Sequence, residues 1–428
     1  MYSFQVGSRA PGAQASSRGD RTAVPRIVYW LGLSSLLADI SAESVASALP
    51  VFLFTVLQLA PLEVGFLDGL YQGGAALVSV IAAYFADRRR NNRGIALLGY
   101  ALSTVSRLGM IASGSLGLLV AMISLCIDRV GKGIRTAPRD AIIAGHTPPA
   151  AMGAAFGVHR ALDAVGAFVG PLVGAALLWL MPERFEGLFW ASFAFGIIGV
   201  LVFRARATEP DIMPTQSALP LASPGLRAML RMLLGNKPFV RLMLLAVFLA
   251  AFTISDGLVY LSMQHDAGID AKTMPLMFAL TSAVFLLAAA PAGRLADRIG
   301  LVPLFLAGYI VLASLYLWLA FGPHQSLPAV VGIVALLGLH YAATDGVLAA
   351  TAARTLDPRV RTSGLAFIST AVGLTRIGSS SLYGWLWQHV DQHAAVVAFA
   401  LGMTVCCLAA GLVLAMIRKP VAPLVPER

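Results

Sequence analysis

LADRIGLVPLFLAGYIVLAS, at residues 295–314, repeats the pattern of an earlier stretch, FADRRRNNRGIALLGYALS at residues 85–103. In each stretch an Asp-Arg pair ends one apolar segment, and a Gly-Tyr pair lies 11 or 12 residues later inside the next one. Matched positions in the two halves of a chain indicate an internal duplication. A duplicated helical unit is the architecture expected when two bundles rock about a shared centre, so the repeat predicts two pseudo-symmetric halves.

The composition places this repeat in a membrane. Of the 428 residues, 58% are hydrophobic and only 12% are charged, whereas a soluble domain has about 25% charged residues. A helix that crosses a bilayer needs roughly 20 apolar residues, and the chain has room for about twelve such helices. The sequence therefore predicts an all-α polytopic membrane protein and argues against a soluble one.

Twelve apolar segments lie along the chain, six on each side of a Pro-rich basic stretch. They cover residues 26–56, 63–86, 94–114, 116–145, 152–181, 188–204, 239–263, 274–294, 301–321, 327–353, 362–387 and 394–417. We expect a disordered cytoplasmic tail, an N-terminal six-helix bundle, a central cytoplasmic linker with one helix on the membrane surface, a C-terminal six-helix bundle and a second cytoplasmic tail. Their respective bounds are 1–25, 26–204, 205–238, 239–417 and 418–428.

The net charge of +10 is spread unevenly over the loops. Basic residues gather after the second segment, in the central linker and in the C-terminal tail, while the intervening loops carry acids. Basic loops stay on the cytoplasmic side of a membrane. We therefore expect both termini to be cytoplasmic and the protein to lie in the cell inner membrane.

The Asp-Arg turns carry a family resemblance. GRLADRIG, at residues 293–300, resembles the loop signature of the major facilitator superfamily, roughly G-x-L-A-D-R-x-G-R-[RK]. The first copy, AYFADRRRNN, departs from it at Ala83 and Arg90, where the family has glycines. The resemblance extends over essentially the whole chain. It implies the fold of that family, with about twelve transmembrane helices in two six-helix bundles, and a cytoplasmic gate formed by Asp87, Arg88, Gly293, Asp297, Arg298 and Gly300.

The fifth segment carries a second motif, GVHRALDAVGAFVGPLVGA at residues 157–175. It matches the family pattern G-x8-G-x3-G-P-x2-G-G through Gly157, Gly166, Gly170, Pro171 and Gly174, with Ala175 in place of the last glycine. Small residues let a helix approach its neighbour closely, and proline bends it. In the family this motif accompanies exporters that exchange substrate for protons. Close packing without that function is the alternative.

The fourth segment contains DRVGKGIRTAPRDA, at residues 128–141. Gly131 and Gly133 fit the family's R-x-x-x-G-x-G pattern, but Ile127 stands in the usual arginine position. The extended GKGIRTAPRDA run is similar to that of a bacterial subgroup, and this similarity implies no substrate.

Charged residues gather on one face of the same segment. Asp128, Lys132, Arg135 and Arg139 lie at offsets of 0, 4, 7 and 11, which share a helical face. Ionisable residues at bilayer depth are costly and are functional candidates by default. One interpretation is a cationic cavity for an anionic substrate, formed by Lys132, Arg135, Arg139, His159, Arg160, Arg107 and Arg376. The other is a cytoplasmic gate in which these charges pair with each other and with Asp140, and which includes Asp128 and Arg129.

Acidic residues inside apolar segments are candidates for carrying protons, because a desolvated carboxylate can titrate. Asp39 and Glu43 lie one turn apart near the middle of the first segment. The remaining candidates are Asp163, Asp256 and Asp345. The alternative is a carboxylate that Arg107 or Arg376 keeps permanently charged.

Other functions have less support in the sequence. His389 and His393 have the spacing of metal ligands, but they lie in an outer loop with one acid, so we expect no metal. We see neither a nucleotide-binding pattern nor a nucleophile-base pair, so we expect no cofactor and no enzymatic activity. The expected partners are a small-molecule substrate, protons and the lipid bilayer, without nucleic acid, and nothing requires more than a monomer.

The sequence favours a secondary active transporter that works by alternating access, with proton-coupled export by antiport as its leading function. Proton-coupled import of an anionic nutrient or chelate is the alternative, supported by the basic face of the fourth segment. A membrane sensor or assembly partner that transports nothing is an alternative from a different class.

Overall fold

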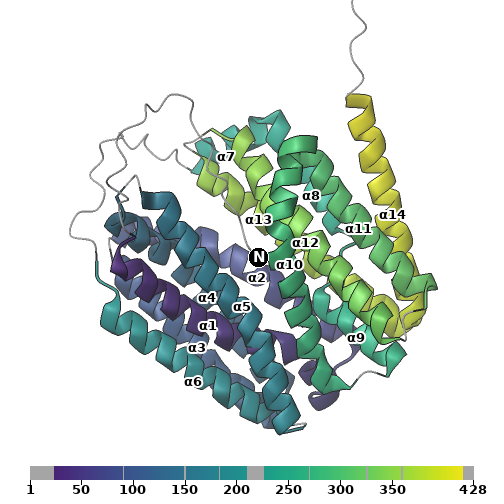
Figure 1. Cartoon of the computed structure of the whole chain (residues 1–428), viewed down its shortest axis with the longest axis horizontal. Coiled ribbons are helices and arrows are strands. Elements are labelled where there is room, and N and C mark those ends of the chain that lie inside the picture. Colours follow the sequence, from purple (N-terminus) through teal and green to yellow (C-terminus); the bar gives the residue numbers. More distant parts are fainter. Residues whose placement is uncertain are drawn as a thin grey trace, which may run out of the picture.

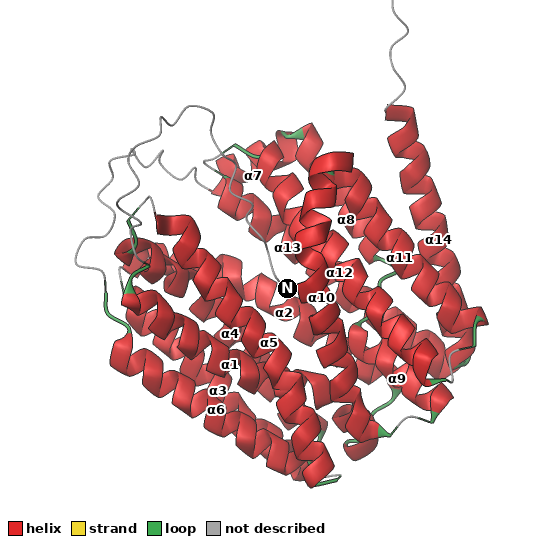
Figure 2. Cartoon of the chain, in the orientation of Figure 1, coloured by secondary structure: helices red, strands yellow, loops and turns green. Residues whose placement is uncertain are grey.

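The computed structural model describes residues 24–89, 91–148, 151–182, 184–209, 226–268, 270–323, 326–357 and 360–417. Within these ranges the chain is almost entirely helical and contains no strand (Figure 2). The expected tails at 1–25 and 418–428 and most of the expected linker lie outside them, because residues 1–23, 210–225 and 418–428 are not described.

Six long helices form the N-terminal half. They are α1 (Arg26–Val51), which a π-helical turn η1 (Phe52–Val56) extends, α2 (Pro61–Arg89), α3 (Asn92–Leu116), α4 (Leu118–His146), α5 (Met152–Leu180) and α6 (Phe185–Arg206). At about 1.5 Å per residue, helices of this length cross a hydrocarbon layer of about 30 Å. Figure 1 shows this half in purple to teal, beside the C-terminal half in green to yellow.

The C-terminal half has the same number of crossings. After the short α7 (Leu226–Gly235) come α8 (Lys237–Ala250), α9 (Asp256–Ala267), the 3-10 turn η3 (Ala271–Thr273), α10 (Met274–Ile299), α11 (Leu301–Phe321), α12 (Leu327–Thr355), α13 (Arg361–His389) and α14 (Gln392–Ile417). Together α8 and α9 make one crossing. By length and composition, eight helices of the described chain qualify as membrane spans. Because α2, α4 and α13 are equally long but carry more polar residues, hydropathy alone does not single them out.

The seventh crossing is interrupted, which differs from the continuous segment expected at 239–263. The helix stops at Ala250 and restarts at Asp256. Thr253 and Ser255 lie in the break, and residues of this type compete with helical hydrogen bonds through their own side chains. The buried phenol of Tyr316 on α11 accepts a hydrogen bond from the backbone N–H of Ile254 at 2.8 Å. The break is therefore stabilised by a specific partner.

The short helix α7 does not continue the crossing that follows it. Its axis lies at 82° to that of α8. Leu233 is buried against the ends of α8, α12 and α13, whereas Arg227 and Arg231 are exposed. This amphipathic arrangement is typical of a helix that lies in the surface plane of a membrane.

The two halves meet at only one end of the bundle. We call the end that holds Arg206 and Leu226 the linker end, and the end that holds Pro61 and His389 the far end. In Figure 1 the two halves lie apart near α7 and together at the opposite end. The main junction runs along α2 and α13, with further contacts of α5 with α10 and of α1 with α9.

Glycines line the α2–α13 junction. A Cβ atom on Gly65 would lie 2.3 Å from the carbonyl oxygen of Ser380, and one on Gly73 would lie 2.7 Å from that of Gly373. One on Gly384 would lie 2.2 Å from the carbonyl oxygen of Pro61. These backbones therefore touch, and the contact runs from the far end to about the middle of α2.

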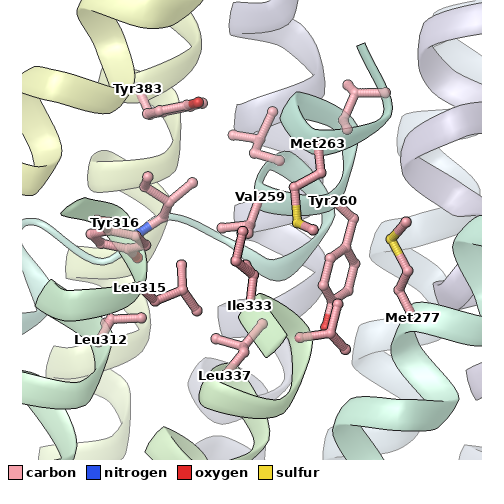
Figure 3. Packing of buried hydrophobic residues seen from close by; sticks show 14 of the residues in the cluster. Val259, Tyr260, Met263, Met277, Leu312, Leu315, Tyr316, Ile333, Leu337 and Tyr383 are labelled. Carbon is pink, nitrogen blue, oxygen red and sulfur yellow. The ribbon is translucent and has the colours of Figure 1, made fainter. Parts of the chain in front are cut away.

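Buried tyrosines organise the core of the C-terminal half. Figure 3 shows Tyr260, Tyr316 and Tyr383 among aliphatic and methionine side chains. Tyr260 is hydrogen-bonded to Thr281, and the Tyr383 hydroxyl lies 2.7 Å from that of Ser262. A buried phenol needs such a partner for its hydroxyl group.

Tyr316→Phe is expected to destabilise the protein by about 1–3 kcal/mol, because it leaves the buried N–H of Ile254 without an acceptor. Tyr383→Phe is the matched control, since its partner Ser262 still donates to the Leu258 carbonyl oxygen at 2.8 Å. Thermal unfolding followed by tryptophan fluorescence measures both. If Tyr383→Phe loses as much stability as Tyr316→Phe, the hydrogen bond from Ile254 to Tyr316 is not what stabilises the break.

Candidate functional site

Two ion pairs join α1 to α4 inside the N-terminal half. The carboxylate of Asp39 lies 3.1 Å from Arg135, and both side chains are buried. One turn further along α1, Glu43 lies 3.5 Å from Lys132, and these side chains remain 27% and 31% exposed. The second pair is therefore accessible, whereas the first is enclosed.

A buried network adjoins these pairs toward the linker end. Arg139 lies 2.9 Å from Asp140 and 3.8 Å from Asp163, and it donates a hydrogen bond to the Ser35 hydroxyl at 3.1 Å. His159 lies between Asp163, 3.5 Å from its Nδ1, and Ser35, 3.3 Å from its Nε2. The helices α1, α4 and α5 thus share a connected set of charged and polar side chains.

The packing of α5 on α1 brings these groups together. A Cβ on Gly166 would lie 2.7 Å from the Leu36 carbonyl oxygen, and one on Gly170 would lie 2.8 Å from the Cβ of Glu43. Gly174 approaches Ser44 in the same way, and Pro171 is buried inside α5. Gly157 differs from the other glycines of the motif, because it is exposed and a Cβ there would meet open space.

The basic face of α4 is not an open cationic surface. Arg135 and Arg139 are buried against carboxylates, and Lys132 is half-exposed beside Glu43. Arg160 on α5 is partly buried. The pairing of these charges favours the second interpretation of the face over the cationic cavity, and the cavity stays a prediction.

Arg107, Asp128 and Arg129 form a separate buried cluster. Arg107 on α3 lies 2.8 Å from Asp128, and each of these side chains is 1% exposed. Arg129 pairs with the same carboxylate and lies 3.6 Å above the ring of Tyr71 on α2. Asp128 is ten residues from the far-end start of α4, near the middle of the bundle. This depth disagrees with a gate at the linker end for Asp128 and Arg129, and the burial of Arg107 disagrees with a cavity position.

The Asp-Arg turns lie at the linker end. Asp87 and Arg88 belong to α2, but their side chains are outside the described part of the structure. Asp297 and Arg298 are exposed at the end of α10, and a Cβ on Gly293 would meet open space. Gly300 has φ +96° between α10 and α11, a conformation that glycine adopts without strain.

The C-terminal half contributes its own polar centre beside the helix break. Asp256, the first residue of α9, accepts a hydrogen bond from the hydroxyl of Tyr341 on α12. Asp256, Tyr341 and Arg376 of α13 line one narrow pocket. Asp345 lies on α12, one turn from Tyr341.

The sequence analysis missed one acid. Asp68 on α2 is only 2% exposed, and its Oδ2 has no hydrogen-bond partner. Its position inside the apolar segment 63–86 was the available signal, by the same reasoning that selected Asp39.

Two six-helix halves that meet at one end, with ion pairs buried at bilayer depth, define a membrane transporter. The family model of the Major Facilitator Superfamily matches residues 31–264 and 257–428. The chain belongs to the Major Facilitator Superfamily and is a transporter, not an enzyme.

Similar proteins agree with this assignment. An uncharacterized MFS-type transporter of Methanocaldococcus jannaschii is 28% identical over 383 residues, covering 88% of this chain and 92% of that protein. The crystal structure of the nucleoside transporter NupG is similar with a TM-score of 0.74 and 13% identity, covering 92% and 100% of the two chains. A bacterial homologue of the lysosomal transporter Spinster, in an inward-facing and unoccupied conformation, has a TM-score of 0.67 and 17% identity, covering 93% and 96%. At these identities the solved structures show the fold alone.

Arg135→Gln is expected to destabilise the protein by about 3–5 kcal/mol, because it leaves the Asp39 carboxylate buried without its partner. Lys132→Gln, which breaks the half-exposed pair, is expected to cost less than about 1 kcal/mol. Chemical or thermal unfolding in detergent measures the difference. The double variant Asp39→Asn/Arg135→Gln should regain part of the loss, and a double variant as unstable as Arg135→Gln argues against the pairing.

Gly166→Val is expected to cost about 1–3 kcal/mol, because the added side chain collides with the backbone of α1. Gly157→Val belongs to the same motif but meets open space, and its expected effect is within about 0.5 kcal/mol. Unfolding midpoints and the yield of monodisperse protein provide the comparison. Equal losses in the two variants would show that α5 does not pack on α1 as described.

Proposed function

We propose that this chain exports a small molecule in exchange for protons, by alternating access, as a monomer in the cell inner membrane with both termini in the cytoplasm. The supporting observation is the pair of buried carboxylates, Asp39 and Asp163, which face arginines of α4 across helix contacts. The packing of α5 on α1 through the glycines of the exporter-type motif adds support for the direction.

The conformation fits the step of such a cycle in which the transporter takes up substrate. The contacts between halves run from the far end to the middle of α2, so substrate reaches the centre from the linker end, which we assign to the cytoplasm. Touching backbones at Gly73 and Gly373 provide a surface over which the halves rock, since no side chain interlocks there. The tight turns around Asp87 and Asp297 would close the linker end in the opposite conformation.

The ion pairs provide a physical means of coupling. A proton on Asp39 or Asp163 removes the negative charge that holds Arg135 or Arg139, and the freed guanidinium then favours a new partner. A substrate that binds near Glu43 and Lys132, the accessible pair, competes for the same charges. Protonation and substrate binding thus oppose each other, which is what exchange requires.

Import of an anionic nutrient or chelate is the second candidate. Lys132 favours it, because it is the most accessible of the α4 cations and lies where the halves face each other. The pairing of Arg135 and Arg139 with acids weighs against it, since an entering anion would have to displace buried carboxylates. A sensor or assembly partner that transports nothing predicts that the buried acids are dispensable.

Asp39→Asn and Asp163→Asn are expected to abolish proton-coupled flux while the protein still binds ligand. A compound library sorted by charge is first screened by thermal shift at about pH 6 and about pH 8, where binding raises the melting temperature. Stabilising compounds are then tested in proteoliposomes that contain a pH-sensitive dye.

The matched control is Asp270→Asn, which removes an exposed acid whose pKa is held below its usual range by hydrogen bonds from Lys272. It should transport normally. Substrate efflux that is driven by an inward proton gradient supports export. Substrate uptake together with protons supports import. Flux that persists unchanged in Asp39→Asn and Asp163→Asn overturns the coupling assignment.

A further inference from the structure

Asp68 belongs to the N-terminal half, but its carboxylate faces the C-terminal half. A Cβ on Gly257 of α9 would lie 2.7 Å from the Asp68 Oδ2, so the carboxylate touches the start of that helix. Ser255 and Asp256 are its polar neighbours across the junction. The Oδ2 atom has no hydrogen-bond partner although the side chain is almost fully buried. A buried carboxylate oxygen without a hydrogen-bond partner is costly, and its position between the halves calls for a physical reason.

A narrow pocket lies beside this carboxylate, between α2, the helix break at 251–255, α9, α12 and α13. Its central space of about 10 Å³ is roughly that of one water molecule. Three polar atoms in its wall have no hydrogen-bond partner, namely Ser255 Oγ, Ser380 Oγ and Arg376 Nε. Ser380 is fully buried. These atoms are suited to hold a water molecule that relays a proton.

The charges around the pocket are unbalanced. Three acids contribute to it, Asp68 from α2, Asp256 from α9 and Asp345 from α12, against one guanidinium, Arg376 from α13. Other titratable neighbours are the phenols of Tyr260, Tyr309, Tyr316 and Tyr341 and the imidazole of His340, whose ring lies 5.3 Å from that of Tyr341. From α1 the apolar Pro50 lies against Gly257. In the described residues around the pocket, the negative charge exceeds the positive charge by two if all acids are ionised, which favours proton uptake.

We propose that Asp68 and Asp256 form a proton-binding site that bridges the two halves, and that proton uptake there keeps the far end closed. This proposal rests on the proposed proton-coupled function and adds a site to it. The carboxylate of Asp68 takes a proton from water at the far end, becomes neutral and is then enclosed by Ser255 and Gly257. Loss of the proton restores a charge that is stable only in water, so the junction opens. Lower pH therefore favours the closed far end and higher pH the open one.

A metal cation fits the pocket less well than a proton. A hard cation takes six or more oxygen ligands, and Arg376 presents a positive charge to the same space. The unpartnered guanidinium N–H of Arg376 is solely a donor, so it needs an acceptor such as a water molecule or a carboxylate, which a cation does not provide.

The test measures the width of the far end directly. Spin labels are placed at Leu180→Cys on α5 and Lys272→Cys in η3, two positions at the far end, where Lys272 lies 5.5 Å from the ring of Trp179, the residue before Leu180. Cys126, Cys406 and Cys407 are first replaced by alanine. Distances are measured in the full chain in lipid nanodiscs. One coupled proton changes the open-to-closed ratio by up to about tenfold per pH unit. The open population of the parent protein should therefore rise with pH, and Asp68→Asn should remain closed throughout.

Two further variants sharpen the test. Glu186→Gln removes an exposed acid at the same end and should keep the parent's response. Asp256→Asn should weaken or shift that response, which gives an independent measurement if Asp68→Asn does not fold. If the open population of both Asp68→Asn and Asp256→Asn still rises with pH as it does in the parent protein, the proposal is overturned. Closure that follows sodium concentration at constant pH overturns it in favour of a cation site.

The same measurements distinguish a failure of this bridging site from a failure of the proposed proton-coupled transport. Suppose that the parent protein transports substrate with protons, but that Asp68→Asn leaves the pH dependence of the far-end distance unchanged. The bridging site is then wrong, and coupling through Asp39 and Asp163 stands. If the parent protein neither couples flux to protons nor changes its far-end distance with pH, the proposed function itself fails.

Discussion

The pairing of charges away from water is the constraint on which this structure depends. A carboxylate or guanidinium inside a bilayer has no solvent to stabilise it, so it must find a partner within the protein. Asp39 finds Arg135, Asp163 finds Arg139, and Asp128 is enclosed by two arginines. These pairs connect α1, α3, α4 and α5, so they fix how the N-terminal bundle is assembled.

The two halves are held together by a different kind of contact. Along α2 and α13 the backbones touch at glycines, at Gly65, Gly73 and Gly384. The break between α8 and α9 adds backbone that is not committed to a helix, and Tyr316 stabilises it. A transporter needs halves that are rigid inside and loosely joined to each other. In this chain the rigid halves come from buried ion pairs and tyrosines, and the loose junction comes from glycines.

The sequence located many of the charges in the centre but could not assign their partners. Asp39 was selected because an acid in an apolar segment is costly. Pairing of such an acid with Arg107 or Arg376 was the alternative, and the observed partner of Asp39 is Arg135. The periodicity of α4 correctly placed Lys132, Arg135 and Arg139 on one face, but it did not show that α1 and α5 supply acids to that face. Asp68 was overlooked although it lies in an apolar segment, and only the structure shows its contact with Gly257.

The amino-acid sequence by itself determined that the chain is an all-helical membrane protein with an internal repeat. These features follow from local hydropathy, from the length that a bilayer demands and from a repeat that can be read along the chain. Only the tertiary structure decided which charges pair, where the seventh crossing breaks, and that the halves meet at the far end. The physical reason is that a helix forms through hydrogen bonds between residues four apart, whereas an ion pair or a glycine contact depends on the distance between helices that the chain does not encode locally.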